Sequence, residues 1–358
     1  MDRIEAVTAR IDARLDKSLA PLEANGTTAS EADAFAAFLA RPGTLKRESL
    51  IVRCRFDGRS FDVATIVDKA YSRRRVQDGL LPCLHRIEPR LTRGFDVFML
   101  ISDMLYVEDA AREEFIHFLG RVPFLRCDWL EGDPVSSNAL IMPDLWLQED
   151  AYAAEVAAID RAAAATPFER REDIIMWRGG LSGPGYPDIE NCLNFPRYRL
   201  LLQALRHPGI IDARLTHYDN LAEGPAGAAL RERLESWFGG VAPFIPVENF
   251  TAYKYLISAD GVAASWKRVA TILWTGSVLL MQHRWRQFFY PGLVAWEQYV
   301  PVADDLSDLI DRYERLRADP TEAQSIARNA REFARHVLTP AAIDNYMCTL
   351  LSRCARLL

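Results

Sequence analysis

A segment in the second half of the chain combines small and cationic residues in a way that suits a phosphate ligand. It reads ADGVAASWKR from Ala259 to Arg268, between apolar residues 253–257 that predict a strand and residues 263–274 that predict a helix. Small side chains let backbone N–H groups approach a ligand, and a helix N-terminus adds a positive dipole end. Glycine-bearing turns before helices are common, so the local pattern by itself favours plain packing over binding.

Two arginine-bearing motifs lie upstream of that segment, each at the edge of a predicted element. Trp177-Arg178-Gly179-Gly180 directly follows an apolar strand over Asp173–Trp177, and Arg197 opens a predicted helix that ends at Arg206. A guanidinium beside glycines can grip phosphate oxygens in a forked geometry. Each arginine alone is equally consistent with a solvated surface position.

Two aspartates follow predicted strands in the first half of the chain. Asp103 comes after the apolar run over Phe95–Ile101, and Asp144 lies within a second apolar stretch, Ala139–Trp146, that Pro143 interrupts. A carboxylate at the carboxyl end of a strand can act as a general base. It can also cap a following turn or helix, and the spacing does not decide between the two roles.

Composition excludes several classes of protein. The chain has 358 residues, 49% of them hydrophobic, and a formal net charge of −6, which gives no electrostatic reason to expect nucleic acid as a partner. Neither Cys-x-x-Cys, Gly-x-x-x-x-Gly-Lys nor Asp-x-Asp occurs, so no metal and no cofactor are expected. No apolar run is long enough to span a membrane, and the N-terminal residues do not resemble a signal peptide. These features predict a protein of the cytoplasm.

Strands and helices alternate along most of the chain, which predicts an α/β fold with parallel sheets. An Asp57-Gly58 pair between alternating segments predicts a hairpin, and an alanine-rich helix over 149–165 is the expected connection between domains. We expect a first domain over residues 1–150, a second over 151–338 and a final helix over 339–358. The apolar face of that helix can either pack back on the first domain or dock on lipid, and packing is favoured.

Seven motifs in a fixed order resemble glycosyltransferase family 90. They read IIMWRGG, FPRYRLL, HPGIIDA, YKYLISADGVAASWKR, TGSVLLMQ, FFYPGLVAWEQYVPV and DPTEAQSIARNAREFA. The family includes Rumi-type protein O-glucosyltransferases, capsule-associated xylosyltransferases and bacterial lipopolysaccharide-modifying enzymes. The resemblance is strong over residues 174–334, thinner over 95–146 and weak over 1–90.

The resemblance implies a GT-B fold, in which two Rossmann-like domains face each other across a cleft. It implies a UDP-sugar donor, inversion at the anomeric carbon, and Asp103 as the catalytic base. The residues expected to bind the donor are Arg178, Gly179, Arg197, Gly261, Val262, Ala263, Ala264, Ser265, Lys267 and Arg268.

The chain departs from the family pattern at several positions. Lys267 stands where relatives often have arginine, with Arg268 next to it, and Gln287 and Gln298 replace a glutamate and a histidine. Ser102 precedes the expected base where relatives have arginine. Lysine cannot make a forked phosphate contact, so these changes bear on the donor sugar and the acceptor.

The expected activity is therefore metal-independent transfer of a hexose or pentose from a UDP-sugar, such as UDP-glucose or UDP-xylose. Because the sequence shows no secretory signal, a cell-envelope glycan such as lipopolysaccharide core is the expected acceptor, with at most peripheral contact with the inner membrane. Two alternatives stay open. One is a UDP-sugar- or glycan-binding protein that has lost catalysis, and the other is an unrelated two-domain nucleotide enzyme.

Overall fold

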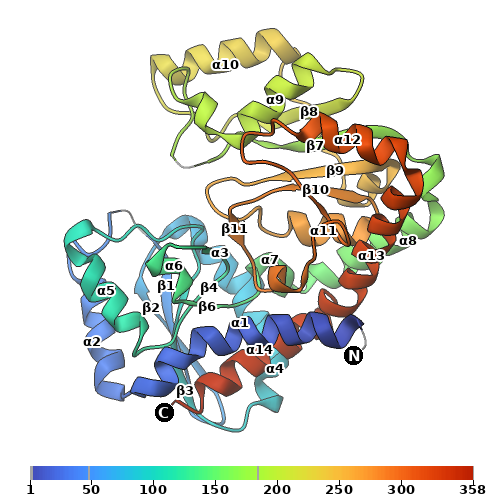
Figure 1. The fold of residues 1–358 in the computed structure, drawn as a ribbon. Helices are drawn as coiled ribbons and strands as arrows, with labels where there is room; N and C mark the ends of the chain where they lie inside the picture. The colour runs from blue at the N-terminus through green and yellow to red at the C-terminus, as the bar shows by residue number, and fades with distance from the viewer. Residues whose placement is uncertain (1–2, 47–48, 184, 358) are drawn as a thin grey trace. The chain divides into compact units, whose positions relative to one another are not determined.

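The chain forms two compact units, each with its own sheet (Figure 1). The computed structural model describes residues 3–46, 49–183 and 185–357. The first unit comprises Met1–Tyr152, Trp285–Gly292 and Thr339–Leu358, and the second comprises Ala153–Arg284 and Leu293–Leu338. Residues 285–292, which the sequence placed in the second domain, thus belong to the first unit.

The first unit is built on a five-stranded mixed sheet in the order β2-β1-β3-β4-β6. Its strands are β1 (Ile51–Phe56), β2 (Phe61–Val67), β3 (Phe95–Leu100), β4 (Phe124–Arg126) and β6 (Leu140–Ile141). The predicted hairpin joins β1 to β2, and Gly58 supplies the positive φ of 94° that its turn requires. Strands β3, β4 and β6 run parallel, so the chain that follows β3 emerges at the carboxyl edge of that part of the sheet.

Helices cover the sheet of the first unit through aromatic and aliphatic contacts. They are α1 (Arg3–Asn25), α2 (Ala29–Ala40), α3 (Arg73–Arg75), α4 (Leu81–Ile87), α5 (Arg112–Leu119), α6 (Pro134–Ser137), α7 (Leu145–Gln148) and α14 (Pro340–Cys354). Phe35 of α2 packs edge-on against Phe98 of β3 with ring centroids 4.9 Å apart. A small two-stranded sheet pairs β5 (Trp129–Leu130) with β11 (Trp285–Arg286).

The final helix, α14, buries its apolar face within the first unit. It contacts α4, α7 and β3, and its buried residues are Ile343, Met347, Cys348, Leu350, Leu351 and Cys354. The face that could have docked on lipid is therefore occupied by protein. None of the helices within the described residues is both long and apolar enough to cross a membrane.

Pro143 interrupts the stretch Ala139–Trp146, as the sequence indicates, and the residues after it are helical. The stretch Ala139–Trp146 is not one strand, because Pro143 ends β6 early and Asp144 then caps α7 by accepting a hydrogen bond from the Trp146 amide, 2.9 Å. The polar run Ser72–Asp78 is helical, since α3 continues through a π-helical turn into α4.

The second unit holds a five-stranded, entirely parallel sheet in the order β12-β10-β9-β7-β8. Its strands are β7 (Glu172–Gly180), β8 (Ile211–His217), β9 (Tyr253–Ala259), β10 (Val278–Gln282) and β12 (Val300–Pro301). The chain steps from β7 outward to β8, then returns past β7 to β9, so the direction of winding reverses between β7 and β9. Ligands of such sheets bind at that reversal, outside the carboxyl ends of the strands.

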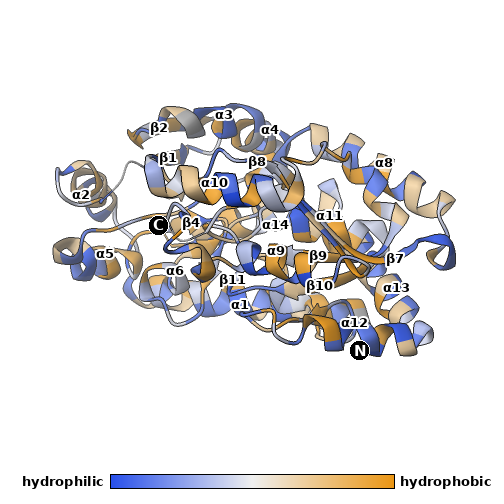
Figure 2. Cartoon of the chain, turned by 90° about the horizontal axis from the view of Figure 1, so that it is seen from above, coloured by the Kyte–Doolittle hydropathy of each residue, from blue (hydrophilic) through white to orange (hydrophobic). Residues whose placement is uncertain are grey.

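Six helices accompany this sheet. They are α8 (Ala151–Ala165), α9 (Pro196–Arg206), α10 (Pro225–Phe238), α11 (Arg268–Thr275), α12 (Leu309–Ala318) and α13 (Pro320–Val337). In Figure 2, α12 and α13 carry both hydrophobic and hydrophilic residues. The α/β class and the organisation into two sheet-based units are confirmed.

Helix α11 begins five residues later than the sequence predicts. Residues 263–267 form bends and a turn, and Trp266 has a positive φ of 46°, a conformation that a right-handed helix cannot contain. The Ser265 hydroxyl donates a hydrogen bond to the Ala259 carbonyl, 2.8 Å, which ties the loop back to the end of β9. The segment Gly261–Ser265 is therefore a loop, not the first turn of a helix.

Candidate functional site

Two loops meet where the winding of the second sheet reverses, and Arg197 joins them. Its Nη1 donates to the Gly180 carbonyl, 3.0 Å, and to the Ser182 hydroxyl, 2.6 Å, after β7, while its Nε donates to the Ala259 carbonyl, 3.2 Å, at the end of β9. Helix α9 can present this side chain because Arg197 lies in its first turn, facing the sheet.

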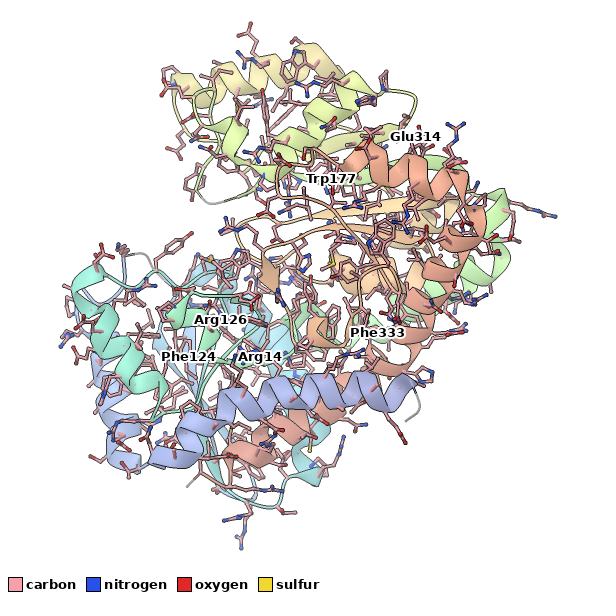
Figure 3. The ribbon with its side chains drawn as sticks, in the orientation of Figure 1. Arg14, Phe124, Arg126, Trp177, Glu314 and Phe333 are labelled. Atoms are coloured by element: carbon pink, nitrogen blue, oxygen red, sulfur yellow. The ribbon has the colours of Figure 1, made fainter. Side chains whose placement is uncertain are left out.

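A second arginine, Arg268, reaches the same place from the start of α11. Its Nη2 donates to the Arg178 carbonyl, 2.7 Å. The guanidinium carbons of Arg197 and Arg268 lie 5.9 Å and 5.6 Å from the centre of the Trp177 ring, which is labelled in Figure 3. Both cations thus pack against one buried aromatic ring near the carboxyl end of β7.

The charges of these two arginines are poorly compensated. Burial lowers the pKa of Arg268 to about 9, and the nearby Arg197 guanidinium adds to the effect. Burial also lowers the pKa of Arg197 to about 10, although the Asp260 carboxylate opposes this shift. Both guanidinium groups keep their charge at neutral pH. Two buried like charges favour binding of an anion between or beside them.

Glycines at the site leave room for the two arginines. A Cβ on Gly179 would lie 2.9 Å from Arg268 Nη2, and a Cβ on Gly261 would lie 2.9 Å from Arg197 Nη2. Any side chain at either position would therefore displace a guanidinium. Glycine is required at both positions because a guanidinium group approaches the backbone closely, and not because the backbone has a positive φ.

The loop Gly261–Ser265 offers backbone donors beside the arginines. The Gly261 amide donates to the Ala263 carbonyl, 3.2 Å, and is already used. Within the described part of the chain, the amides of Val262 and Ala263 have no hydrogen-bond acceptor. Together with two guanidinium groups, such amides form the donor set that suits phosphate oxygens.

Two cationic residues expected at this site are held elsewhere. Arg178 forms an ion pair with Asp212 on β8 and donates to the Asp212 carbonyl, 2.8 Å, so its guanidinium faces the neighbouring strand. Lys267 forms an ion pair with Glu155 of α8. Of the four basic residues expected to bind the donor, the structure thus places Arg178 and Lys267 in ion pairs with other segments. Only Arg197 and Arg268 meet at Trp177.

The expected base, Asp103, follows β3 in the first unit and is partly exposed. It forms an ion pair with Arg75 at the end of α3, which also donates to the Ile101 carbonyl, 3.2 Å. The preceding residue, Ser102, is buried and accepts a hydrogen bond from the Leu50 amide, 2.7 Å. Asp103 thus caps no helix, and a cation from another segment orients its carboxylate.

A second carboxylate of the first unit, Asp144, is completely buried. Burial raises its pKa to about 7, against the opposing effects of the Trp146 amide, the Arg75 charge and a hydrogen bond from Gln287. Gln287 Nε2 lies 3.2 Å from the Asp144 carboxylate. Gln298 is the other glutamine that differs from the family pattern. It accepts a hydrogen bond from the Val294 amide, 2.8 Å, and stabilises a loop of the second unit.

Sequence reasoning missed Ser182, Trp177 and Arg75 as members of these constellations. Ser182 looked like part of an ordinary Gly- and Pro-rich loop, and Trp177 looked like the last core residue of a strand. Arg75 ends a run of three arginines, of which Arg73 and Arg74 form exposed ion pairs within their own segment. Only Arg75, at 10% side-chain exposure, is directed inward.

Neither metal nor thiol chemistry gains support from the described residues. Among them no group of three or more His, Cys, Asp or Glu side chains is arranged to hold a metal ion. All six cysteines are free and buried. Burial raises the pKa of Cys54, Cys83, Cys127 and Cys354 far above neutral pH, so these thiols stay protonated.

A family comparison defines the class of protein to which these features belong. Residues 145–358, more than half of the chain, match the sequence pattern described as "Glycosyl transferase family 90". The chain therefore belongs to glycosyl transferase family 90. The matched stretch contains both arginines and the loop Gly261–Ser265, and it leaves Asp103 outside.

Curated relatives are named as sugar transferases. Human Protein O-glucosyltransferase 1 is 28% identical over 198 residues, which cover 55% of this chain and 45% of the human protein. Mouse Protein O-glucosyltransferase 3 is 26% identical over 159 residues, covering 44% of this chain and 29% of the mouse protein. The match thus spans about half the length of the human relative, or less.

One solved structure similar to this chain is that of Anabaena Alr3699/HepE in complex with UDP-glucose. It aligns with a TM-score of 0.44 at 10% sequence identity, and the alignment covers 68% of this chain and 67% of that protein. This likeness is too low to support an argument about function.

The uncompensated charge of Arg268 makes a testable prediction about stability. We expect Arg268→Met to raise the free energy of unfolding by about 1 kcal/mol without ligand, because an apolar side chain of similar length removes a buried like-charge contact. Urea unfolding at low ionic strength measures this change in the free energy of unfolding, with the exposed Arg206→Met as the matched control. A loss of stability in Arg268→Met would show that the charge is satisfied within the protein.

The buried carboxyl group of Asp144 leads to a prediction about how the stability of the fold depends on pH. Its pKa in the folded state, about 7, lies above the value of about 3.9 for an unfolded chain, so the folded state retains the proton longer. Stability from this group is therefore complete below pH ~4 and lost as pH rises through ~7, by up to about 4 kcal/mol.

Asp144→Asn stays neutral and should escape that loss, so its stability relative to the wild type should rise between pH 5 and pH 8. Urea unfolding at both pH values measures the difference, with the exposed Asp12→Asn as control. An Asp144→Asn effect that is equal at both pH values would mean that Asp144 is ionised throughout.

Proposed function

We propose that this protein transfers a sugar from a UDP-sugar to a hydroxyl group of a glycan. The observation that carries the proposal is the pair Arg197 and Arg268, packed on Trp177 beside the loop Gly261–Ser265. Two cations and backbone amides at the winding reversal of a parallel sheet suit the diphosphate of a nucleotide sugar. The names of the relatives favour glucose over xylose as the transferred sugar.

The proposed reaction is inverting and needs no metal. The bond from the anomeric carbon to the diphosphate oxygen breaks, and the acceptor oxygen bonds to that carbon from the opposite face. The acceptor's proton passes to Asp103, and negative charge accumulates on the departing UDP. Arg197, Arg268 and the amides of Val262 and Ala263 stabilise that charge, which is the role that a divalent cation has in other transferases.

Arg75 has a positioning role in this scheme. Its ion pair with Asp103 fixes the direction of the carboxylate before an acceptor arrives. The proposed acceptor is a cell-envelope glycan such as lipopolysaccharide core, and the proposed compartment is the cytoplasm. The basis for both is the resemblance to bacterial members of the family.

A second candidate function is binding of a UDP-sugar without catalysis. The observation that favours it is the set of departures from the family pattern: Lys267 is held by Glu155, and Gln287 lies in a buried position against Asp144. A binding protein needs the arginine pair but not Asp103. The two functions therefore differ in what Asp103 contributes.

The first test is a UDP-release assay with a panel of UDP-sugars, with and without glycan acceptors. We expect one donor, UDP-glucose before UDP-xylose, to be turned over. Asp103→Asn should lower turnover by about 10²–10⁴-fold, since a general base supplies a factor of that size, while UDP affinity stays unchanged.

Asp109→Asn is the matched control, because this carboxylate of the first unit is exposed and pairs with Lys46 on the surface. Undiminished turnover by Asp103→Asn would exclude Asp103 as the base. Tight UDP-sugar binding without turnover on any acceptor would establish the binding protein instead.

The second test measures UDP affinity by calorimetry. We expect Arg197→Lys and Gly261→Ala each to weaken UDP binding about tenfold or more, the cost of losing a charge-assisted hydrogen bond. Gly261→Ala acts indirectly, since its methyl group would push Arg197 away from its place. Arg206→Ala, on the exposed side of the same helix, should bind UDP normally. Equal affinity in all four proteins would place the diphosphate elsewhere.

A further inference from the structure

A second cationic pocket lies in the second unit, at the amino end of β7. Its cavity has a volume of about 370 Å³, and four arginines line it. They are Arg171, which immediately precedes β7, and Arg328, Arg331 and Arg335 on successive turns of α13. Apolar contact comes from Phe168 and Ala327. The cavity is large enough for a small metabolite.

Arg171 is the most unusual of these residues, because its charge is buried without a carboxylate bonded to it. Only 6% of the residue is exposed. Its Nε donates to the Thr166 carbonyl, 3.1 Å, and its Nη1 donates to the Gly276 carbonyl, 2.7 Å, and the Ser277 hydroxyl, 2.9 Å. Among the described residues, Nη2 has no acceptor.

The surroundings of Arg171 leave part of its charge uncompensated. Burial and, to a lesser extent, the Arg331 charge lower its pKa to about 10, and Glu169 opposes both effects. The Gly276 carbonyl ends helix α11, whose dipole supplies only about half a negative charge. Three structural hydrogen bonds explain why an arginine stands here, but they leave the two N–H groups of Nη2 without an acceptor in a residue that lines the cavity.

The α13 arginines divide into two kinds. Arg331 and Arg335 share one carboxylate, Asp160 of α8, with Nη2–oxygen distances of 2.8 Å and 3.0 Å. Arg328 makes only a weak hydrogen bond, 3.3 Å, to the Ser325 hydroxyl. Glu169 and Glu332 also line the cavity, and Glu169 accepts a hydrogen bond from Gln324. Cations still outnumber carboxylates around the space.

This pocket is separate from the proposed donor site. Arg171 precedes the first residue of β7, whereas Arg178, Gly179 and Gly180 end that nine-residue strand. At about 3.3 Å per residue, the two ends lie roughly 25–30 Å apart. An anion bound at one end of the sheet therefore cannot touch the other site.

We propose that this pocket binds a small phosphorylated metabolite through its phosphate group. The Nη2 of Arg171 and the guanidinium of Arg328 provide donors to the phosphate oxygens, and the half-neutralised Arg331 and Arg335 favour a dianion over a neutral ligand. The remaining volume, lined by Phe168, Thr166 and Gln324, takes the organic part. The inference does not depend on the proposed transferase activity.

The test is calorimetric titration of the whole chain in a buffer free of phosphate and sulfate, with saturating UDP to occupy the donor site. The probes are inorganic phosphate, glucose 6-phosphate and, as the uncharged match, glucose. We expect saturable binding of both phosphates, at one site and with Kd of about 1 mM or lower, and none of glucose. Arg328→Ala and Arg171→Gln should each weaken binding about tenfold or more.

Arg170→Ala is the matched control, since Arg170 is exposed and does not line the cavity; it should bind phosphate normally. Arg197→Lys should also bind phosphate normally, which separates this pocket from the donor site. If Arg171→Gln fails to fold, Arg328→Ala still tests the proposal, because Arg328 makes no buried contact on which folding depends. No saturable phosphate binding, or binding that Arg328→Ala leaves unchanged, would overturn the proposal.

Discussion

The packing of two guanidinium groups on Trp177 is the constraint on which the second unit depends. Arg197 and Arg268 come from different helices, α9 and α11, and reach the ring only because β7 and β9 are adjacent and parallel. The two guanidinium groups occupy the space that a Cβ at position 179 or 261 would need, which explains why both positions are glycine. They also tie the loops after β7 and β9 together through carbonyl groups. When no ligand is bound, the two guanidinium groups repel each other, and the surrounding backbone holds them in place.

Much of this site could be predicted from sequence because its parts are local. The apolar runs of β7 and β9 and the small residues after them located both regions, although Arg178, Gly179 and Gly180 still belong to β7 rather than to the loop that follows it. The start of α11 was misplaced because Ala263, Ala264 and Ser265 are compatible with a helix. What ends that possibility is the left-handed backbone of Trp266, which no residue preference indicates.

The partners of the charged residues could not be predicted, because they come from distant segments. Arg178 lies next to the glycines, yet Asp212 on the adjacent strand holds it, 34 positions along the chain. Lys267 stands where relatives often have an arginine. Its partner Glu155, 112 positions away, withdraws it, and the following residue, Arg268, stacks on Trp177 instead. The departure at 267 therefore does not deprive the site of its second guanidinium.

Helix α11 connects the two cationic regions of the second unit, and its dipole affects them in opposite ways. Arg268 is its first residue, so the positive end of the dipole adds to the charge at Trp177 and increases the tendency to bind an anion. Its C-cap, Gly276, has a left-handed φ of 63° and directs its carbonyl at Arg171, so the negative end offsets part of that charge. The same geometry that compensates one arginine thus leaves the other dependent on a ligand.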